Sequence, residues 1–383
     1  MRILIVIDDY FNGGNGMSIS TRRFVTEFRR LGHEVRVLAS HAGGEPDYPL
    51  PIATVPLVAG LIAEQGFNFA RPVDSVIDAA VSWADIVHVE TPFPVCAQAA
   101  KAARAQGKPV TGTFHVYPEN MTASVPILEQ GIVNDAMLRY FYRSVYRYCQ
   151  VIQCPTEHVE KRLAAAGYKT TLQTISNGIP REAIAKSVAQ NTPSEGPHTI
   201  LSVGRFAREK DQETLIRAIP LTRDPQRIRL VLAGHGPLES HYKALADKHG
   251  VNLSTAFFAQ EELRAQIDKT DLYVHCARVE VEGMSCMEAF ARGVVPVISD
   301  GGLSATSSYA MTQSNTYTVG EVAELAHRID YWLDRPQERL KVGLRYLAMA
   351  KDLSIGVSAA RVLTMMEVAV LNSRRSHVEG KAS

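Results

Sequence analysis

The sequence predicts an α/β protein made of two domains, each built around a parallel sheet. Three observations support this fold class. At 383 residues the chain is too long for one ordinary core and suits two domains of roughly 180 residues each. Short apolar runs alternate with amphipathic helical stretches along most of its length. The stretch from Tyr273 to Ser299 reads as strand, loop, helix and strand, which is the repeating unit of a parallel sheet.

Charge and cysteine content narrow the class of protein. The 41 basic residues balance 40 acidic ones, which argues against nucleic acid as the main partner. The five cysteines are an odd number without CxxC spacing, so reduced thiols in a cytosolic protein are the simplest account. The N-terminal apolar run is too short for a signal peptide, and no run of apolar residues is long enough to span a membrane. We expect the chain in the cytoplasm or on the inner face of the membrane.

The first half of the sequence begins like a nucleotide-binding domain. Arg2–Ile7 reads as a buried strand, and a loop from Asp8 to Met17 leads into a helix over Ser18–Leu31. The glycines of this loop do not match GxGxxG, so they are weak support for a dinucleotide, and a plain tight turn is the alternative for Gly14. We expect further strands at Val35–Ala39, Ala53–Pro56, Ile86–Val89, Val110–Phe114, Val151–Gln153 and Leu172–Ile175.

Polar side chains follow two of these strands. Glu90 to Phe93 come directly after one strand, and His115 and Glu119 come after the next. The carboxyl ends of parallel strands are where α/β sheets bind their ligands. A histidine at such a place can bond a ligand hydroxyl or the carbonyl of a neighbouring strand. The position of His115 does not by itself decide between these two readings.

The stretch from Asp135 to Gln150 predicts an amphipathic helix. Leu138, Phe141, Val145 and Tyr148 form its apolar side. The opposite side carries Arg139, Arg143 and Arg147, flanked by Tyr140, Tyr142 and Tyr146. A basic stripe edged with tyrosine suits the surface of an anionic membrane. The alternative is a core helix with a solvated cationic face.

The second half opens after a turn and a polar stretch, which place a domain boundary near 180–196. A strand at Thr199–Val203 leads into Gly204, and Arg205 and Lys210 follow before a helix that starts at Asp211. Two fixed cations at the end of a strand can neutralise a diphosphate, and a surface ion-pair role is the alternative. We expect the next strand at Arg229–Leu232, followed by a turn containing Gly234 and Gly236, and a helix at Gln260–Asp268.

The most informative loop follows the strand Leu272–His275. It carries Glu280, Glu282 and Gly283 before a helix over Ser285–Ala291 and a strand at Val294–Ile298. Gly283 lets the backbone approach a ligand closely, and the N–H groups at the start of the helix favour an anion. Glu280 and Glu288 can each accept hydrogen bonds from vicinal hydroxyls, so one could hold a ribose and the other a hexose. An acidic solvated loop before an ordinary helix is the alternative.

These motifs resemble a known family. The spacing Glu280-x7-Glu288 before GVVPVIS and the GR-x4-K element at 204–210 resemble the retaining GT-B glycosyltransferases of family 4, also called group 1. The stretches 10–24, 62–72 and 113–126 are similar to the bacterial 1,2-diacylglycerol 3-α-glucosyltransferases within that family. Many relatives have their first Glu followed directly by Gly. Here Glu282 holds that place, and we assign the role to Glu280 because it has the seven-residue spacing.

The resemblance implies a GT-B architecture, in which two Rossmann-like domains face each other across a cleft that holds the active site. The first domain, on the acceptor side, is expected at 1–180, and the nucleotide-sugar domain at 197–352. A last helix over 353–372 is expected to cross back to the first domain. The tail at 373–383 is predicted to be disordered.

The resemblance also implies roles for residues. Arg205 and Lys210 would stabilise the leaving diphosphate, Glu280 would bind the hexose and Glu288 the ribose, and His115 would orient the sugar from the first domain. Donor contacts are implied for Gly14, Gly204, Gly234, Gly283, Met284, Ser285 and Glu288. The sequence has no DxD motif and no cluster with metal-ligand spacing, so we expect a metal-independent transferase without a cofactor.

The expected reaction moves a hexose, most simply glucose from UDP-glucose, onto 1,2-diacylglycerol with retention of the α configuration. Such an enzyme would work as a peripheral protein on the anionic inner face of the cell membrane. The alternatives are a phosphatidylinositol mannosyltransferase, a transferase for a soluble glycan, and a sugar-nucleotide-binding protein without activity. The sequence leaves the donor base and the sugar epimer open.

Overall fold

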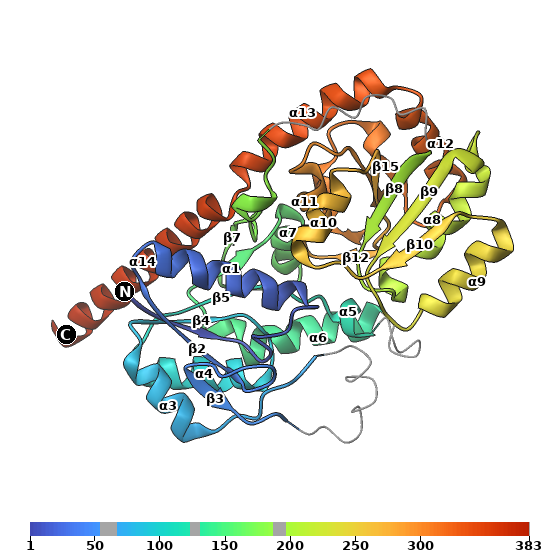
Figure 1. Cartoon of the computed structure of the whole chain (residues 1–383). Helices are drawn as coiled ribbons and strands as arrows, with labels where there is room; N and C mark the ends of the chain where they lie inside the picture. Colours follow the sequence, from blue (N-terminus) through green and yellow to red (C-terminus); the bar gives the residue numbers. More distant parts are fainter. Residues whose placement is uncertain (54–66, 123–130, 187–196, 383) are drawn as a thin grey trace. The chain divides into compact units, whose positions relative to one another are not determined.

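The structure of the protein, a computed structural model, describes residues 1–53, 67–122, 131–186 and 197–382. The chain divides into two compact units (Figure 1). Unit 1 comprises Met1–Gly178 together with Ile355–Ser383, and unit 2 comprises Ile179–Ser354. The chain thus leaves unit 1 at Gly178 and returns to it at Ile355. Gly178 is required there, because it has a φ of +80° and an added Cβ would lie 2.6 Å from the Cα of Ile355.

Unit 1 contains a seven-stranded sheet in the order β3-β2-β1-β4-β5-β6-β7, and every pairing in it is parallel. The interior strand β1 pairs on both sides, with Ile3 opposite Val35 and Ile86. The strand order reverses between β1 and β4, and that reversal is where such sheets bind ligands. The strands are β1 Arg2–Val6, β2 Glu34–Ser40, β3 Tyr48–Leu50, β4 Ile86–Val89, β5 Val110–Thr113, β6 Val151–Cys154 and β7 Thr171–Thr174.

The helices of unit 1 connect these strands. Asn15 caps α1 by accepting the N–H of Met17, and Gly32 follows the helix with a φ of +87°. The C-terminal helix α14 packs on α1, β5 and β6 and supplies part of the unit's apolar core (Figure 1). The helices are α1 Gly16–Arg30, α3 Asp74–Trp83, α4 Pro94–Ala105, α5 Pro118–Thr122, α6 Gly131–Ser144, α7 Glu157–Ala165 and α14 Ile355–Ala382, with a 3-10 turn η2 at Tyr146–Tyr148.

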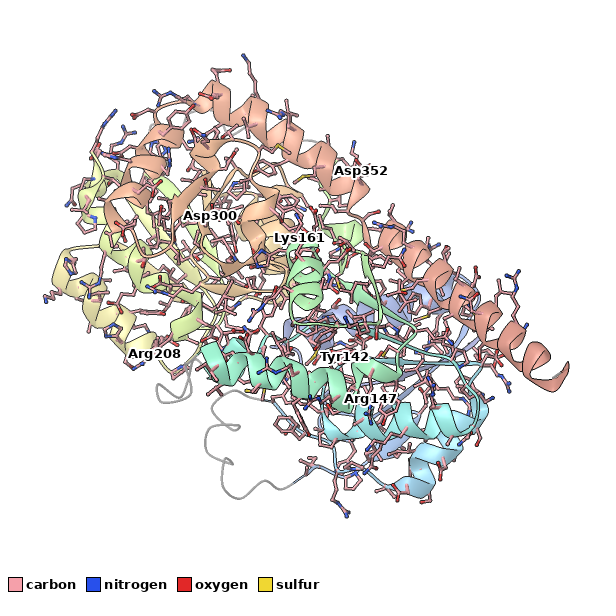
Figure 2. All side chains as sticks on the ribbon, turned by 180° about the vertical axis from the view of Figure 1, so that it is seen from behind. Tyr142, Arg147, Lys161, Arg208, Asp300 and Asp352 are labelled. Carbon is pink, nitrogen blue, oxygen red and sulfur yellow. The ribbon has the colours of Figure 1, made fainter. Side chains whose placement is uncertain are left out.

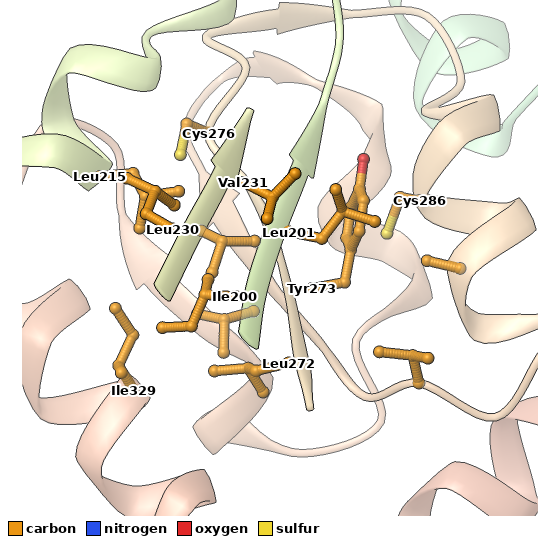
Figure 3. Packing of buried hydrophobic residues seen from close by; sticks show 14 of the residues in the cluster. Ile200, Leu201, Leu215, Leu230, Val231, Leu272, Tyr273, Cys276, Cys286 and Ile329 are labelled. Atoms are coloured by element: carbon orange, nitrogen blue, oxygen red, sulfur yellow. The ribbon is translucent and has the colours of Figure 1, made fainter. Parts of the chain in front are cut away.

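Unit 2 contains a six-stranded parallel sheet in the order β10-β9-β8-β11-β13-β15. Ile200 on β8 lies opposite Leu230 on one side and Leu272 on the other, and all three are fully buried (Figure 3). The strand order reverses between β8 and β11. The strands are β8 His198–Val203, β9 Ile228–Ala233, β10 Leu253–Ala256, β11 Leu272–His275, β13 Pro296–Asp300 and β15 Thr316–Thr318, and a separate pair is formed by β12 Val279–Glu280 and β14 Leu303–Ser304.

The helices of unit 2 are α8 Gln212–Ala218, α9 Glu239–His249, α10 Gln260–Ile267, α11 Met284–Phe290, α12 Val322–Leu333 and α13 Pro336–Asp352. Short 3-10 turns lie at η3 Arg181–Ala183, η4 Arg208–Lys210, η5 Ile219–Leu221, η6 Pro225–Arg227, η7 Ala305–Tyr309 and η8 Gln313–Asn315. One apolar cluster runs through the unit from Ile179 to Ala350, so its core lies within its own residues.

The helix before β6 and two of the strands differ from the sequence-based expectation. The helix predicted over 135–150 ends at Ser144, because Val145 leaves helical geometry with φ −126° and ψ −63°. The chain turns there so that Tyr146 enters the core and its hydroxyl donates to the carbonyl of Thr113 over 3.1 Å. The strands β3 and β15 were not expected. The strand predicted at Ala53–Pro56 lies largely outside the described residues.

The C-terminal helix is longer than expected. Its backbone continues to Ala382 through the stretch predicted to be a disordered tail, where no proline interrupts it. Among the described residues, the segment Ile355–Arg375 is the one helix long and apolar enough to cross a membrane. Half of its apolar window is buried within the protein, and Ala359 and Met366 are fully buried. The segment therefore packs as a core helix of unit 1.

Candidate active site

The reversal point of the unit 2 sheet brings together three of the residues singled out in the sequence. Arg205 and Lys210 lie on the loop after β8, and Glu280 lies on the loop after β11. These loops are neighbours because β8 pairs with β11. Nζ of Lys210 lies 2.5 Å from Oε2 of Glu280, and both side chains keep part of their surface exposed, 23% and 18%. The pair can therefore contact both solvent and a ligand.

The turn before α8 fixes Lys210 in place. Asp211 adopts a left-handed conformation with φ 50° and ψ 35°, which is uncommon for a residue other than glycine. Its carboxylate accepts hydrogen bonds from Oγ1 of Thr214 and from Nε of Arg278, both at 2.9 Å. These contacts hold a strained backbone in one conformation, as is common where a side chain must be presented in a fixed direction.

Electrostatics keep Glu280 ionised. Burial alone would raise the pKa of Glu280, but the charge of Lys210 and the hydrogen bond from Lys210 together lower it. His275 lies behind this pair, with Nε2 3.6 Å from Oε2 of Glu280 and 3.3 Å from Oγ1 of Thr306. Burial lowers the pKa of His275 to about 4, so its imidazole is neutral at physiological pH.

Arg205 is also paired with a carboxylate. Its Nη2 donates to Oε1 of Glu209 over 2.6 Å, and Glu209 itself is 6% exposed. Its main-chain carbonyl accepts from Nε2 of Gln212 over 3.1 Å. Both cations are thus oriented by a carboxylate partner while their own side chains stay partly accessible. This arrangement can receive an anionic ligand without a large rearrangement.

Some of the predicted donor-binding glycines are required by the packing around them, and others are not. Gly234 has φ +151°, and an added Cβ would lie 2.0 Å from the carbonyl oxygen of Gly204, so the packing of two loops requires glycine there. Gly236 is crowded in the same way by the backbone of Phe206. At Gly204 and Gly14 the nearest atom would be 3.6 Å away, which is an ordinary contact. Nothing within the described chain requires glycine at those two positions.

The loop and helix after β11 carry the remaining predicted donor contacts. Gly283 precedes α11, and a Cβ there would lie 2.5 Å from Oγ1 of Thr306. Oγ of Ser285 donates to the carbonyl of Val203 over 3.2 Å and accepts from the hydroxyl of Tyr273 over 3.0 Å. Ser285 therefore ties α11 to the end of β8. Met284 begins the helix, and Glu288, 7% exposed, lies within it.

Glu280 and Glu282 have different environments. Oε1 of Glu282 accepts from the hydroxyl of Tyr309 over 2.7 Å, and Glu282 is 4% exposed. Glu280 instead faces Lys210 at the reversal point. The structure thus turns Glu282 into the interior and leaves Glu280 beside Lys210. This difference follows from the strand β12, where Val279 and Glu280 pair with Leu303 and Ser304.

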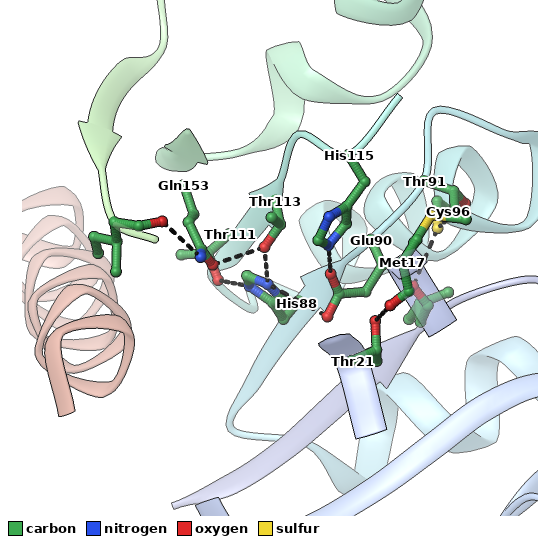
Figure 4. A network of polar contacts seen from close by, with 12 residues as sticks. Met17, Thr21, His88, Glu90, Thr91, Cys96, Thr111, Thr113, His115 and Gln153 are labelled. Carbon is green, nitrogen blue, oxygen red and sulfur yellow. Dashed lines mark hydrogen bonds and ion pairs between the residues drawn. The ribbon is translucent and has the colours of Figure 1, made fainter. Parts of the chain in front are cut away.

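In unit 1, His115 belongs to a buried polar network (Figure 4). Its Nε2 lies 2.8 Å from Oε2 of Glu90, and the two side chains are 5% and 3% exposed. His88 lies beside them, with Nε2 3.8 Å from Oε1 of Glu90. The sequence placed Glu90 at the end of a strand but gave it no role. Its pairing with His115 follows from β4 and β5 being neighbours.

The sequence analysis also missed Asp8, at the reversal point of the unit 1 sheet. One carboxylate oxygen accepts from Oγ1 of Thr91 over 2.7 Å and the other from the N–H of Ala70 over 3.1 Å. Burial raises the pKa of Asp8 to about 6, against the opposing effect of these hydrogen bonds. An acidic residue directly after an N-terminal strand was the available signal.

The basic surface of unit 1 is smaller than expected. Arg139 and Arg143 are exposed on α6, but the end of the helix at Ser144 separates Arg147 from them. Arg147 is exposed, lies near Tyr142 (Figure 2), and stacks over the ring of Tyr148 at 4.7 Å. The assignment of Tyr146 to this surface is wrong, because its side chain is fully buried. Tyr142 is half-buried and packs on Tyr168 with the ring centroids 4.8 Å apart.

Within the described residues, no group of three or more His, Cys, Asp or Glu side chains is arranged to hold a metal ion. All five cysteines are buried and unpaired. The polar groups at the unit 2 reversal point are therefore two cations, one partly exposed carboxylate and the backbone around α11. They suit a ligand that carries phosphate and hydroxyl groups.

Comparison with known proteins supports this interpretation. The model of Glycosyltransferase Family 4 matches residues 14–183, and that of Glycosyl transferases group 1 matches residues 184–345. The alpha-monoglucosyldiacylglycerol synthase of Streptococcus pneumoniae is 25% identical over 323 residues, which cover 79% of this chain and 71% of that protein. A GDP-mannose-dependent alpha-mannosyltransferase of Corynebacterium glutamicum is 24% identical over 311 residues, covering 77% and 71%.

Solved structures show the same fold. HepE of Anabaena, in complex with UDP and glucose, superposes with a TM-score of 0.73 at 15% identity, over 96% of this chain and 100% of that one. Two Rossmann-like units with parallel sheets in one chain make up the GT-B fold. With the two family models matching in succession from residue 14 to residue 345, the chain belongs to the GT-B glycosyltransferases of family 4, the group 1 type.

Proposed function

We propose that the enzyme transfers glucose from UDP-glucose to the free hydroxyl of 1,2-diacylglycerol, with retention of the α configuration and without a metal ion. The observation that carries this proposal is the Lys210–Glu280 pair beside Arg205 at the reversal point of the unit 2 sheet. It offers two cations to a diphosphate and one carboxylate to sugar hydroxyls. That is the set of groups a nucleotide sugar needs.

In the proposed reaction, the bond between the anomeric carbon and the β-phosphate oxygen breaks, and the acceptor oxygen attacks from the same face. The acceptor proton passes to the leaving phosphate, so charges balance without a protein nucleophile. Lys210 and Arg205 stabilise the negative charge that grows on the diphosphate. Glu280, held ionised by Lys210, accepts hydrogen bonds from the hexose, and Glu288 accepts from the ribose.

The proposed acceptor and location rest on two observations. The Streptococcus pneumoniae relative is named for a diacylglycerol product. On α6, Arg139, Tyr140 and Arg143 are exposed, and Ile132 is 79% exposed. Basic and amphipathic side chains on one helix suit an anionic lipid surface. We infer that the enzyme works as a peripheral protein on the inner face of the membrane.

A second candidate differs in its donor. The Corynebacterium glutamicum relative, named for GDP-mannose, is nearly as similar as the glucosyl lipid synthase, 24% against 25% identical. The same pair of cations would hold a GDP leaving group equally well, since it carries the same diphosphate. Mannose transfer to a lipid is therefore the alternative.

The test offers radiolabelled UDP-glucose, UDP-galactose and GDP-mannose in parallel, with mixed micelles of diacylglycerol and anionic lipid and with EDTA in place of metal. We expect label in the chloroform phase with UDP-glucose alone, and an α linkage in the isolated product. Transfer from GDP-mannose alone would favour the second candidate. Transfer only after addition of a divalent metal would contradict metal independence. Hydrolysis of a donor without any lipid product would direct the search to soluble acceptors.

A further inference from the structure

In the hydrogen-bond network around His88, the structure determines which atom of each pair donates and which accepts (Figure 4). They start at the carbonyl of Ile175, which can only accept, and Nε2 of Gln153 donates to it over 3.0 Å. The other end of the Gln153 amide is then its oxygen, which accepts from Oγ1 of Thr113 over 2.9 Å. The hydroxyl hydrogen of Thr113 is thereby used.

The directions of the two hydrogen bonds of His88 follow from that of Thr113. Because the hydroxyl of Thr113 donates its hydrogen to Gln153, its oxygen accepts a hydrogen bond from Nε2 of His88 over 2.9 Å. Nδ1 of His88 lies 2.9 Å from Oγ1 of Thr111 and accepts its hydrogen. Burial lowers the pKa of His88, against the pull of Glu90, so the ring is neutral and its tautomer is set. His88 does not neutralise the charge of Glu90.

Glu90 depends on His115 for its main hydrogen bond. Burial would raise the pKa of Glu90, but the hydrogen bond from His115 opposes this and the pKa of Glu90 is lowered, so Glu90 stays ionised. An ionised carboxylate can only accept. Nε2 of His115, 2.8 Å away, must therefore carry the hydrogen, while Nε2 of His88 at 3.8 Å is beyond hydrogen-bond distance.

The other ring nitrogen of His115 is left for a ligand. In the part of the chain that the structure describes, Nδ1 of His115 has no hydrogen-bond partner. We propose that Glu90 is a positioning residue that fixes His115 as the Nε2–H tautomer, so that Nδ1 accepts a hydrogen bond from one hydroxyl of the donor sugar. This inference rests on the proposed function for the identity of the ligand. The tautomer itself depends only on the contact between Glu90 and His115.

The first arm of the test needs no substrate. Protein labelled with ¹⁵N-histidine is studied by long-range ¹H–¹⁵N NMR, and the signal of His115 is assigned by its loss in His115→Gln. Near pH 8 we expect Nε2 protonated and Nδ1 bare. In Glu90→Gln the carboxylate that selects this tautomer is gone, so the ¹⁵N shifts of the two ring nitrogens of His115 should move toward those of a mixture of both tautomers. Thr111→Val is the matched control, because Thr111 contacts His88 and not Glu90, so this variant should leave the tautomer of His115 unchanged.

The second arm measures transfer from UDP-glucose and from each of its monodeoxy analogues. We expect Glu90→Gln to lower kcat/KM roughly tenfold to hundredfold, by analogy with the loss of residues that orient metal-binding histidines. Removing the one donor hydroxyl that bonds Nδ1 should lower kcat/KM of the native enzyme by a similar factor. The same deoxy donor should lower kcat/KM of Glu90→Gln little further, because that variant has already lost the contact. The affinity for UDP, which lacks the hexose, should be the same in both proteins.

Three results would overturn the proposal: a protonated Nδ1 in the native protein near pH 8, an unchanged His115 tautomer in Glu90→Gln, or equal penalties from every deoxy donor in both enzymes. Because the NMR arm uses no donor, it decides the tautomer even if another nucleotide sugar turns out to be the substrate. A failure of the proposed function is thereby distinguished from a failure of this inference.

Discussion

At the scale of single residues, the two cations at the carboxyl edge of the unit 2 sheet are each paired with a carboxylate of the same unit. Lys210 is held by Glu280 and Arg205 by Glu209, at 2.5 and 2.6 Å. Partly exposed ion pairs contribute little to stability, about 1 kcal/mol or less. Their value at this place is orientation, because each carboxylate holds its cation in the direction a diphosphate would need.

Replacing Lys210 tests this role directly. Lys210→Met removes the positive charge and leaves Glu280 without its partner, so we expect glycosyl transfer to fall by roughly a hundredfold to a thousandfold. Initial rates of lipid labelling measure the loss. Lys243→Met is the matched control, since Nζ of Lys243 makes a similar ion pair with Glu239, 2.7 Å long, on the surface helix α9. Full activity in Lys210→Met would remove Lys210 from the active site.

Asp8 gives a prediction for stability against pH. Its pKa rises from the ordinary 3.8 to about 6 on folding, so between these values the native state binds more protons than the unfolded state. Asp8 should therefore destabilise the fold progressively as pH rises from about 4 to about 6, by about 3 kcal/mol in total. Asn at this position resembles the protonated acid and can keep both contacts, to Thr91 and Ala70.

Urea unfolding of the native protein and of Asp8→Asn at steps of pH measures this effect. The free energy of unfolding of Asp8→Asn relative to the native protein should rise through that interval and then level off. Other carboxylates, such as Glu90 with its lowered pKa, change both proteins alike and cancel in the difference. Parallel curves for the two proteins would show that Asp8 does not titrate in this range.

Individual site residues could be predicted from the sequence, but the contacts that they make with one another could not. Arg205, Lys210 and Glu280 could be found because each follows a strand, and parallel strands bring their carboxyl ends to one edge. The Lys210–Glu280 contact joins residues 70 positions apart, and the pairing of Glu90 with His115 joins residues 25 apart. Such contacts depend on which strands become neighbours, and no local pattern records that order.

At the scale of elements, most strands of both sheets could be predicted because a strand buried on both faces reads as an apolar run. The exceptions, β3 and β15, have three residues each, YPL and TYT, and lack such a run. The helix α6 was predicted too long. Its apolar spacing continues past Ser144, but burying the Tyr146 ring in the core outweighs two more helical turns.

The shortened helix gives a sharper prediction for membrane binding. Arg139 and Arg143 remain exposed on α6, and each should contribute about 1 kcal/mol of attraction to an anionic surface. The double variant Arg139→Ser with Arg143→Ser should therefore bind liposomes rich in anionic lipid roughly thirtyfold more weakly at low salt. Co-sedimentation measures the change. Arg147→Ser is the matched control, because Arg147 stacks on Tyr148 outside the helix and should bind as the native protein does.

At the scale of the whole molecule, the two units differ in how the chain forms them: unit 2 is continuous in sequence, and unit 1 is made of two separate segments. Unit 2 is one continuous segment whose apolar cluster lies within Ile179–Ser354. Unit 1 is completed only by α14, which places eight buried side chains in its core: Ile355, Ala359, Val362, Leu363, Met365, Met366, Ala369 and Val370. Losing several large buried side chains costs more than the 5–15 kcal/mol by which a typical domain is stable.

A chain that ends at Ser354 should therefore lose the fold of unit 1 and keep that of unit 2. The two tryptophans report the units separately, since Trp83 lies in α3 of unit 1 and Trp332 is buried in α12 of unit 2. In the truncated chain we expect the emission of Trp83 at the wavelength of an exposed indole, while Trp332 keeps its unfolding midpoint in urea. Variants with a single tryptophan, made by replacing the other with Phe, separate the two signals.

UDP binding by the truncated chain should persist, because the proposed diphosphate contacts of Arg205 and Lys210 lie in unit 2. Loss of both tryptophan transitions together would show instead that the two units fold as one cooperative system, and that α14 stabilises residues beyond its own core.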